Sequence, residues 1–226
     1  MITDINSMWK ELRQRIETCQ FCELCNTRAK AVFGEGPIHS KVVVIGEAPG
    51  NQENLEGRPF VGPAGNLLTG ILENGGGIAR NSVYITNIVK CWPPPEDKTK
   101  KNGQPDNKQI STCINFLEAQ LFLLQPKIIV TMGNIATKAL LKSGEGITNL
   151  RGTWHNWRGI KLLPMLHPSY LLRQRDAKEL KILKLKTWND VYSLRQAIKA
   201  LGISKEMLVD DDDEKFKPPQ TFSDNS

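Results

Sequence analysis

Four cysteines have the spacing of a metal-binding set. Cys19 and Cys22 form a CxxC pair, and Cys91 and Cys113 lie far downstream, each next to the end of a predicted element. Four thiolates gathered in this way suit a tetrahedral zinc ion or an iron–sulfur cluster, and unliganded buried thiols are the alternative. Cys25 extends the pair to CxxCxxC, but the rest of a ferredoxin pattern is missing, so we expect a small buried residue there.

Three polar residues directly follow predicted strands, and each type suits a different chemical task. Glu47 could orient a water molecule or stabilise a cation, because its carboxylate follows a buried strand. Asn87 offers both a donor and an acceptor, which is what reading the edge of a base requires. His167 as a neutral imidazole can donate to a developing oxyanion. Each residue alone is more often structural, and their shared position favours function.

The loop after the first predicted strand is rich in glycine and proline, but it does not match a phosphate-binding loop. The residues GEAPG at 46–50 contain neither GxGxxG nor GxxxxGK[ST], and a glutamate at this position would repel a phosphate. The continuation GRPFVGPAG at 57–65 brings Phe60 toward the same crevice. Burial in the core is the commoner fate of a lone phenylalanine.

Strands alternate with helices along the chain, which predicts an α/β fold with a parallel sheet covered on both faces. In such a sheet the functional site lies at the carboxyl ends of the strands, where the three polar residues stand. Apolar runs predict strands, including a hairpin, and helical periodicity predicts helices: strands 41–45, 83–86, 128–132, 154–157 and 160–165, and helices 8–18, 65–74, 107–124, 134–141 and 177–201.

Composition places the 226-residue chain among ordinary globular proteins, since 39% of its residues are apolar and 24% are charged. No apolar run reaches the roughly 18 residues that a membrane span needs. The start of the chain lacks a secretory pattern, so we expect a cytoplasmic protein without membrane contact. The net charge of +6 permits binding to a phosphate backbone, although a basic protein without a nucleic-acid partner is equally consistent with it.

Several motifs together resemble the family 4 uracil-DNA glycosylases, the iron–sulfur enzymes of bacteria and archaea. The motifs are GEAPG (46–50), GRPFVGPAG (57–65), YITNIVKC (84–91) and PMLHPSYLLR (164–173), with supporting matches at CxxC (19–22), VFGEG (32–36) and the RG of 151–152 followed by Trp154. The resemblance runs from about residue 10 to about residue 200. Each motif alone is modest, but their order and spacing are specific.

The resemblance implies a three-layer α/β/α fold with a central four-stranded parallel sheet. It implies release of uracil from DNA to leave an abasic site, as in base excision repair of deaminated cytosine. It also implies a [4Fe-4S] cluster, zinc being the alternative metal, and a role for each matching residue. By this matching the cluster binds Cys19, Cys22, Cys91 and Cys113; Glu47 positions or polarises water; Phe60 stacks on uracil; Asn87 reads its edge; His167 binds its O2 oxygen; and Ala48 and Pro49 line the pocket through their backbone.

A base inside a duplex must be flipped out before it can be cleaved, and we expect the segment after His167 to contact the DNA. The contact candidates are Ser169, Tyr170, Leu171 and Arg173, with the stretch 170–173 as the wedge that fills the vacated space. Between 173 and 186 six basic residues face two acidic ones. These residues could hold DNA phosphates, although a charge run is more often only a solvated helix face.

We expect residues 1–208 to form one domain, which includes the N-terminal cluster-binding segment, and residues 209–226 to form an acidic disordered tail. The expected partner is uracil-containing DNA, single- or double-stranded, bound by a monomer whose tail contacts another repair protein. The alternatives are a covalent uracil-binding relative, a non-enzymatic iron–sulfur protein and a zinc-stapled nucleotide-binding module. The covalent relative is disfavoured because 92–107 contains no histidine to act as its nucleophile.

Overall fold

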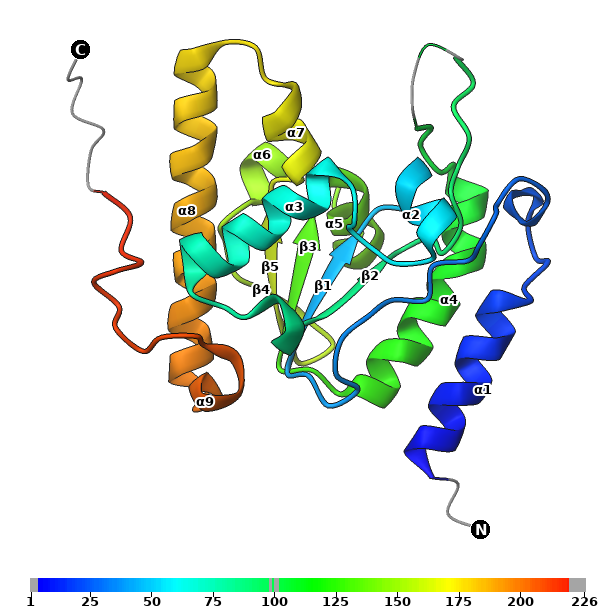
Figure 1. The fold of residues 1–226 in the computed structure, drawn as a ribbon, viewed down its shortest axis with the longest axis horizontal. Coiled ribbons are helices and arrows are strands. Elements are labelled where there is room, and N and C mark those ends of the chain that lie inside the picture. Colours follow the sequence, from blue (N-terminus) through cyan, green and yellow to red (C-terminus); the bar gives the residue numbers. More distant parts are fainter. Residues whose placement is uncertain (1–3, 98, 100–101, 220–226) are drawn as a thin grey trace.

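A five-stranded sheet forms the centre of the protein, with helices on both of its faces (Figure 1). The structure is a computed structural model that describes residues 4–97, 99 and 102–219. The strand order is β2-β1-β3-β5-β4, and the strands are β1 Val42–Gly46, β2 Tyr84–Asn87, β3 Ile128–Met132, β4 His155–Trp157 and β5 Ile160–Met165. The first four strands in this order run parallel, as expected, and the hairpin adds β4 as a fifth, antiparallel strand at the edge.

The side chains of β1 explain why a continuous apolar run forms the middle of this sheet. Val43 and Ile45 pack into one hydrophobic cluster, whereas Val42 and Val44 pack into another on the opposite face. All four side chains are fully buried. A strand covered on both faces has no solvent-exposed position, so its sequence does not alternate with polar residues.

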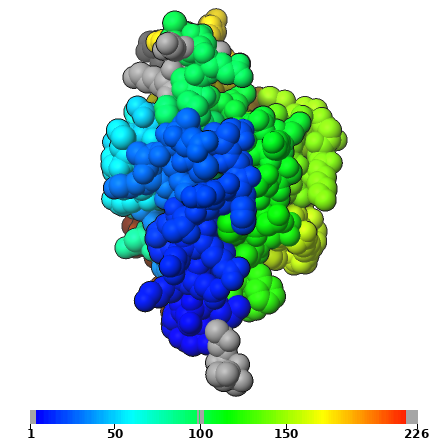
Figure 2. Space-filling view, turned by 90° about the vertical axis from the view of Figure 1, so that its right-hand side faces the viewer, coloured from blue at the N-terminus to red at the C-terminus, as the bar shows by residue number. Residues whose placement is uncertain are grey.

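One face of the sheet is covered by α4 (Asn107–Leu124) and α5 (Asn134–Leu141). Helix α4 begins at a capping box in which Asp106 and Gln109 satisfy each other's backbone N–H groups. Outside α4 lies α1 (Ile5–Glu17), which buries Leu12 and Ile16. Figure 2 shows the blue N-terminal segment lying against the green residues of α4. The N-terminal cysteines are thereby brought to the flank of α4.

The opposite face is covered by α3 (Pro63–Gly70), its π-helical continuation η2 (Ile71–Gly75) and the long helix α8 (Ala177–Ala200). Short helices occupy connections that the sequence predicted only as loops or left unassigned: η1 Glu23–Asn26, α2 Asn51–Glu56, η3 Arg80–Ser82, α6 Ile147–Leu150, α7 Pro168–Arg173 and α9 Ser204–Met207. Among the described residues, no helix has both the length and the apolar composition for crossing a bilayer.

Residues 209–219, here called the C-terminal strap, lie against α8. The carboxylate of Asp213 accepts from Nε of Arg195 at 2.7 Å, and the Arg195 side chain is fully buried. The guanidinium of Arg195 also lies 4.4 Å from the ring centre of Phe216, whose carbonyl accepts from Trp188 Nε1 at 2.8 Å. The strap is therefore held by a buried charge on α8. The remaining tail residues, 220–226, lie outside the described residues.

Candidate active site

The loops that carry the candidate residues begin at one edge of the sheet. In the parallel register of β1 and β2, Gly46 stands beside Asn87, so the last residues of both strands are neighbours. On the next pair of strands, the N–H of Gly133 donates to the carbonyl of Met165 at 2.9 Å. Glu47 therefore starts its loop near Asn87, and His167 starts its own loop at the same carboxyl edge. This is the edge where parallel α/β sheets place their sites.

The side chains of Asn87, Phe60 and His167 meet at this edge. The ring centres of Phe60 and His167 lie 5.8 Å apart, with the ring planes at 32°. A Cβ atom at Gly46 would overlap Oδ1 of Asn87 and would lie 2.7 Å from Cζ of Phe60. Because Gly46 has no side chain, the ring of Phe60 and the amide of Asn87 can both approach its Cα. The amide, the aromatic ring and the imidazole of His167 therefore lie next to one another.

His167 is the N-terminal cap of α7, and its ring nitrogen Nδ1 accepts from the backbone N–H of Ser169 at 3.1 Å. The hydroxyl Oγ of Ser169 lies 2.7 Å from the same nitrogen. Burial, with a smaller contribution from the charge of Arg173, lowers the pKa of His167 to about 4. The ring is therefore neutral at pH 7. Because Nδ1 accepts, the proton of the neutral ring stands on Nε2, which makes Nε2–H a donor.

Glu47 follows β1 directly, and its carbonyl accepts from the N–H of Val89 at 3.0 Å. Burial raises the pKa of the Glu47 carboxyl to about 7, while the positive charge of Arg173 acts in the opposite direction. The same arginine lowers the pKa of His167. A carboxyl whose pKa stands near neutrality can both hold and release a proton at physiological pH, which is the property of a general base. In the same loop, Pro49 is buried and Ala48 is partly buried.

The cysteines gather at a second place, between the N-terminal segment and α4. One narrow cavity is lined by all four of the expected ligands, Cys19, Cys22, Cys91 and Cys113. Cys25 does not line this cavity and remains only partly buried, with its thiol 3.4 Å from Asn26 Oδ1. As the described side chains stand, no three His, Cys, Asp or Glu residues are arranged to hold a single metal ion.

Two N–H groups point at the sulfur atoms of this cysteine cavity. Nη1 of Arg28 donates to Sγ of Cys91 at 3.1 Å, and the backbone N–H of Lys90 donates to Sγ of Cys113 at 3.3 Å. Burial raises the pKa of the Cys113 thiol to about 11, and burial also raises that of Cys91. Thiols in this environment keep their protons unless a cation binds them. Four thiols with N–H donors to sulfur fit a thiolate-bound iron–sulfur cluster.

With this geometry in hand, comparison with known proteins decides the family. The model of the uracil DNA glycosylase superfamily matches residues 33–191, which is more than half of the chain. The chain belongs to the uracil-DNA glycosylase superfamily.

Three curated relatives of this superfamily are type-4 uracil-DNA glycosylases. The protein of Thermotoga maritima is 41% identical over 165 residues, which covers 72% of this chain and 82% of the relative. The protein of Sulfurisphaera tokodaii is 37% identical over 179 residues, covering 76% and 79%. The protein of Saccharolobus solfataricus is 38% identical over 169 residues, covering 71% and 76%. These relatives confirm the family resemblance seen in the motifs, and the α/β fold class is confirmed with it.

The helix after His167 carries the residues that were expected to contact DNA, and the structure shows which of their side chains are exposed. Leu171 is only 4% exposed because it packs with Leu166 and Leu183 in a small hydrophobic cluster, so its side chain does not face solvent. The exposed apolar side chains of this helix are Tyr170 and Leu172, at 40% and 50%. Consecutive residues of a helix point in different directions, and the sequence alone did not show which of the two leucines faces the core.

Lys90 lies beside the candidate site of this uracil-DNA glycosylase superfamily member, and the sequence did not single it out. Its ammonium group is buried and donates to the carbonyl of Asn87 at 2.7 Å, to Thr86 Oγ1 at 2.7 Å and to Gln120 Oε1 at 2.6 Å. Its own backbone N–H donates to Cys113. Lys90 thus connects the carbonyl of Asn87, the residue expected to recognise the base, to the cysteine cavity. The signal in the sequence was a lysine inside the apolar stretch that precedes Cys91.

Proposed function

We propose that the protein hydrolyses the N-glycosidic bond of deoxyuridine in DNA, releasing uracil and leaving an abasic site for base excision repair. The observation that carries this proposal is the meeting of Asn87, Phe60 and His167 at the carboxyl edge of the sheet, with the partly buried Glu47 in the adjoining loop. Membership of the uracil-DNA glycosylase superfamily supports the same reaction. Each of these residues has a distinct role in it.

Cleavage of the bond develops two opposite charges, a uracil anion and a sugar with oxocarbenium character, as in other glycoside hydrolysis. Nε2–H of His167 donates to the O2 oxygen of the leaving uracil, where negative charge grows. Glu47 orients the attacking water and accepts its proton, and its carboxylate also stabilises the sugar cation. The acceptor bond at Nδ1 of His167 is what leaves Nε2 with the proton.

Recognition of uracil rests on the other two side chains. Phe60 stacks on the base, and the amide of Asn87 pairs with its Watson–Crick edge, because an amide offers a donor and an acceptor side by side. Asn87 is only 2% exposed, so a wrong base would leave its buried amide without partners. Ala48 and Pro49 line the pocket through their backbone groups.

The target base reaches this pocket by leaving the stack of the DNA, whether the DNA is single- or double-stranded. We assign the wedge that fills the vacated space to the exposed Tyr170 and Leu172. Ser169 and Arg173 contact the phosphate backbone next to the flipped nucleotide, and Nη1 of Arg173 already donates to Oγ of Ser169 at 3.0 Å. The phosphate contacts hold the strand, and the wedge prevents the base from returning.

We assign the cysteine cavity to a [4Fe-4S] cluster on Cys19, Cys22, Cys91 and Cys113, with zinc as the alternative. The support is the four thiols around one cavity and the two N–H donors directed at sulfur. When bound, the cluster would join the N-terminal segment to α4 and to the loop after β2. Its proposed role is structural, because it would hold these three segments together.

The proposed reaction is tested by incubating the purified protein with a uracil-containing oligonucleotide, followed by alkali cleavage and detection of free uracil. The matched control has thymine at the same position. We expect cleavage at uracil alone, and an unbroken uracil strand would reject the proposal. Protein that stays attached to the DNA under denaturing conditions would instead identify the covalent relative.

The remaining expectations on partners and location are proposals of the same kind. We propose a cytoplasmic monomer whose acidic C-terminus contacts another repair protein. In the strap, Asp213 is engaged by Arg195 and Lys199, whereas the carboxylates of Asp211 and Glu214 are 76% and 79% exposed. The exposed acids, rather than Asp213, are therefore the residues that such a partner would meet.

A further inference from the structure

The aromatic ring proposed to stack on uracil is carried by an unfavourable backbone conformation. Phe60 has φ of 51°, in the left-handed region that residues other than glycine rarely occupy. The backbone of Gly65 approaches so closely that a Cβ atom there would overlap the carbonyl of Phe60. Conformations of this kind persist only where the surrounding structure holds them in place. The turn at Phe60 therefore needs a group that holds it in place.

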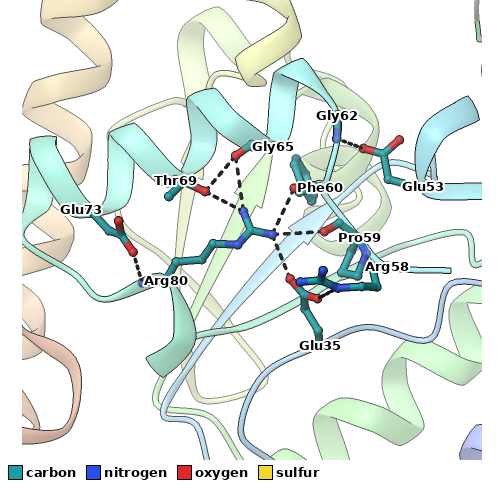
Figure 3. Close-up of polar contacts among 10 residues, drawn as sticks. All are labelled: Glu35, Glu53, Arg58, Pro59, Phe60, Gly62, Gly65, Thr69, Glu73 and Arg80. Carbon is teal, nitrogen blue, oxygen red and sulfur yellow. Dashed lines mark hydrogen bonds and ion pairs between the residues drawn. The ribbon is translucent and has the colours of Figure 1, made fainter. Parts of the chain in front are cut away.

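The guanidinium of Arg80 occupies the inside of this turn (Figure 3). Nη2 of Arg80 donates to the carbonyl of Phe60 at 3.1 Å and to the carbonyl of Pro59 at 3.2 Å. Nη1 donates to the carbonyl of Gly65 at 3.4 Å and to Oγ1 of Thr69 at 3.0 Å. One side chain therefore binds the carbonyls on both sides of the strained residue and the carbonyl that closes the turn.

Arg80 is itself fixed in position. Its Nη2 is 3.0 Å from Oε1 of Glu35, and its backbone N–H donates to Oε1 of Glu73 at 3.2 Å. Glu35 pairs with Ile85 of β2 through two backbone hydrogen bonds, and its second carboxylate oxygen accepts from Arg58. The guanidinium of Arg80 thus connects the turn at Phe60 to β2, the strand that ends at Asn87.

We propose that Arg80 is a positioning residue that sets the stacking geometry of Phe60 and acts on uracil only through that ring. The predicted effect on uracil binding rests on the proposed function, whereas the predicted effect on the backbone at Phe60 does not. The contacts of Arg80 are to backbone carbonyls, a hydroxyl and a carboxylate. A forked guanidinium is suited to several acceptors at once, whereas a lysine ammonium is a single point of charge.

The substitution Arg80→Lys isolates this role, because it keeps a positive charge near Glu35 and loses the fork. We would measure inhibition by free uracil, which reports the base pocket without any contribution from DNA binding. Stacking of a base on an aromatic ring is worth about 1–3 kcal/mol, so Phe60→Ala should raise the inhibition constant by about 5- to 150-fold. Arg80→Lys should raise it by about three- to tenfold, a part of the same effect.

The double variant decides whether Arg80 acts through Phe60. If it does, Arg80→Lys changes nothing further once Phe60→Ala is present, since the ring to be positioned is gone. A role in general stability would instead make the two effects multiply, and that outcome would overturn the proposal. The matched control is Arg151→Lys, which alters a second partly buried arginine whose Nε lies 2.9 Å from Asp190 Oδ2. This control should leave the inhibition constant unchanged.

Hydrogen exchange gives a readout that does not depend on activity. In Arg80→Lys, the amides of residues 57–65 should exchange faster, while those of α4 and α8 keep the wild-type rates. If Arg80→Lys does not fold, Thr69→Val removes one acceptor of Nη1 and should change exchange in the same segment to a smaller degree. Unchanged exchange at 57–65 in a folded variant rejects the positioning role. An inactive wild-type protein would reject the proposed function, while the exchange result would still decide the role of Arg80.

Discussion

The backbone N–H of Ser169 donates to Nδ1 of His167 over 3.1 Å. This contact fixes which end of the imidazole carries the proton, because a nitrogen that accepts from an N–H cannot itself be protonated. The low pKa of His167, about 4, keeps the ring neutral. A neutral ring with its proton on Nε2 stabilises negative charge on a leaving base by donation rather than by a full positive charge.

The first prediction compares the donor with the stacking ring. Removing one oxyanion donor typically lowers the rate by about 10²–10³, so we expect His167→Ala to lose that much in single-turnover assays. Phe60→Ala should lose less, since stacking contributes about 1–3 kcal/mol. Ser169→Ala keeps the backbone N–H that sets the tautomer and loses only a proposed phosphate contact, so with saturating enzyme it should lose less rate than His167→Ala. Equal losses in His167→Ala and Phe60→Ala would contradict the assigned roles.

The second prediction concerns pH. Burial raises the pKa of Glu47 to about 7, so this carboxyl takes up a proton as the pH falls through neutrality. If the ionised form orients the water, the single-turnover rate rises with pH up to about 7 and then levels off. His167 adds no limb in this range, because its pKa is about 4. Glu47→Gln should be slower and should show a flat profile between pH 5 and 8; a slope that survives in this variant would assign the titration to another group.

The third prediction separates the five cysteines. Replacing Cys91 or Cys113 with serine should abolish the brown colour and the iron content of the purified protein, because each lines the shared cavity. Cys25→Ser should keep both, since Cys25 lies outside that cavity. The measurement is iron analysis together with the visible absorption spectrum. A colourless wild-type protein that contains zinc would select the alternative metal.

The fourth prediction concerns the basic residues at the start of α8. Lys178 and Lys184 are exposed on this helix, which follows the candidate wedge. If they neutralise DNA phosphates, replacing either with alanine should weaken binding and lower the slope of log affinity against log salt by about 1. The assay is fluorescence anisotropy with a thymine oligonucleotide at several salt concentrations. Lys127→Ala, an exposed change at the opposite end of the sheet, should leave the slope unaltered. A wild-type affinity that does not change with salt would exclude the role.

The fifth prediction concerns stability. Arg195 is fully buried and Asp213 supplies its counter-charge. We expect Asp213→Ala to lower the free energy of unfolding by about 1–3 kcal/mol, the cost of leaving a buried group unsatisfied. Asp211→Ala is the matched control, because its carboxylate is 76% exposed and should change stability by less than about 0.5 kcal/mol. Denaturant unfolding measures both, and equal values would show that the strap does not depend on this ion pair.

The sequence predicted the main helices and strands because their signals are local. The helix at 107–124 and the helix at 134–141 have the bounds that their periodicity indicated, and the strand predicted at 41–45 is shifted by one residue. The short helix α2 was missed because it has six residues and ends at Gly57, whose φ of 79° closes it. Such short helices are set by tertiary contacts rather than by their own propensity.

Residue type and the order of the strands were enough to predict which polar side chains gather at the candidate site. Glu47 and His167 each follow a strand and Asn87 is the last residue of one, and parallel strands bring their ends together. The groups that support them were not predictable. Nothing in the sequence distinguishes Lys90 from the other lysines, and Arg80 binds carbonyls about 20 residues away in the sequence. The burial of Leu171 was not predictable for the same reason, since only the packing against α8 decides which leucine of the pair is buried.

The dependence of Arg195 on the C-terminal strap also limits how this lineage can evolve. Two of the three groups that its guanidinium binds by hydrogen bonds, the Asp213 carboxylate and the carbonyl of Asp210, lie in the strap; the third is the carbonyl of Gly76. A descendant without the strap would keep only the carbonyl of Gly76 among these partners and would lose the Phe216 ring that lies over the guanidinium, so we expect the strap and the arginine to be kept or lost together. Where a homologue ends soon after α9, an uncharged residue should therefore replace this arginine.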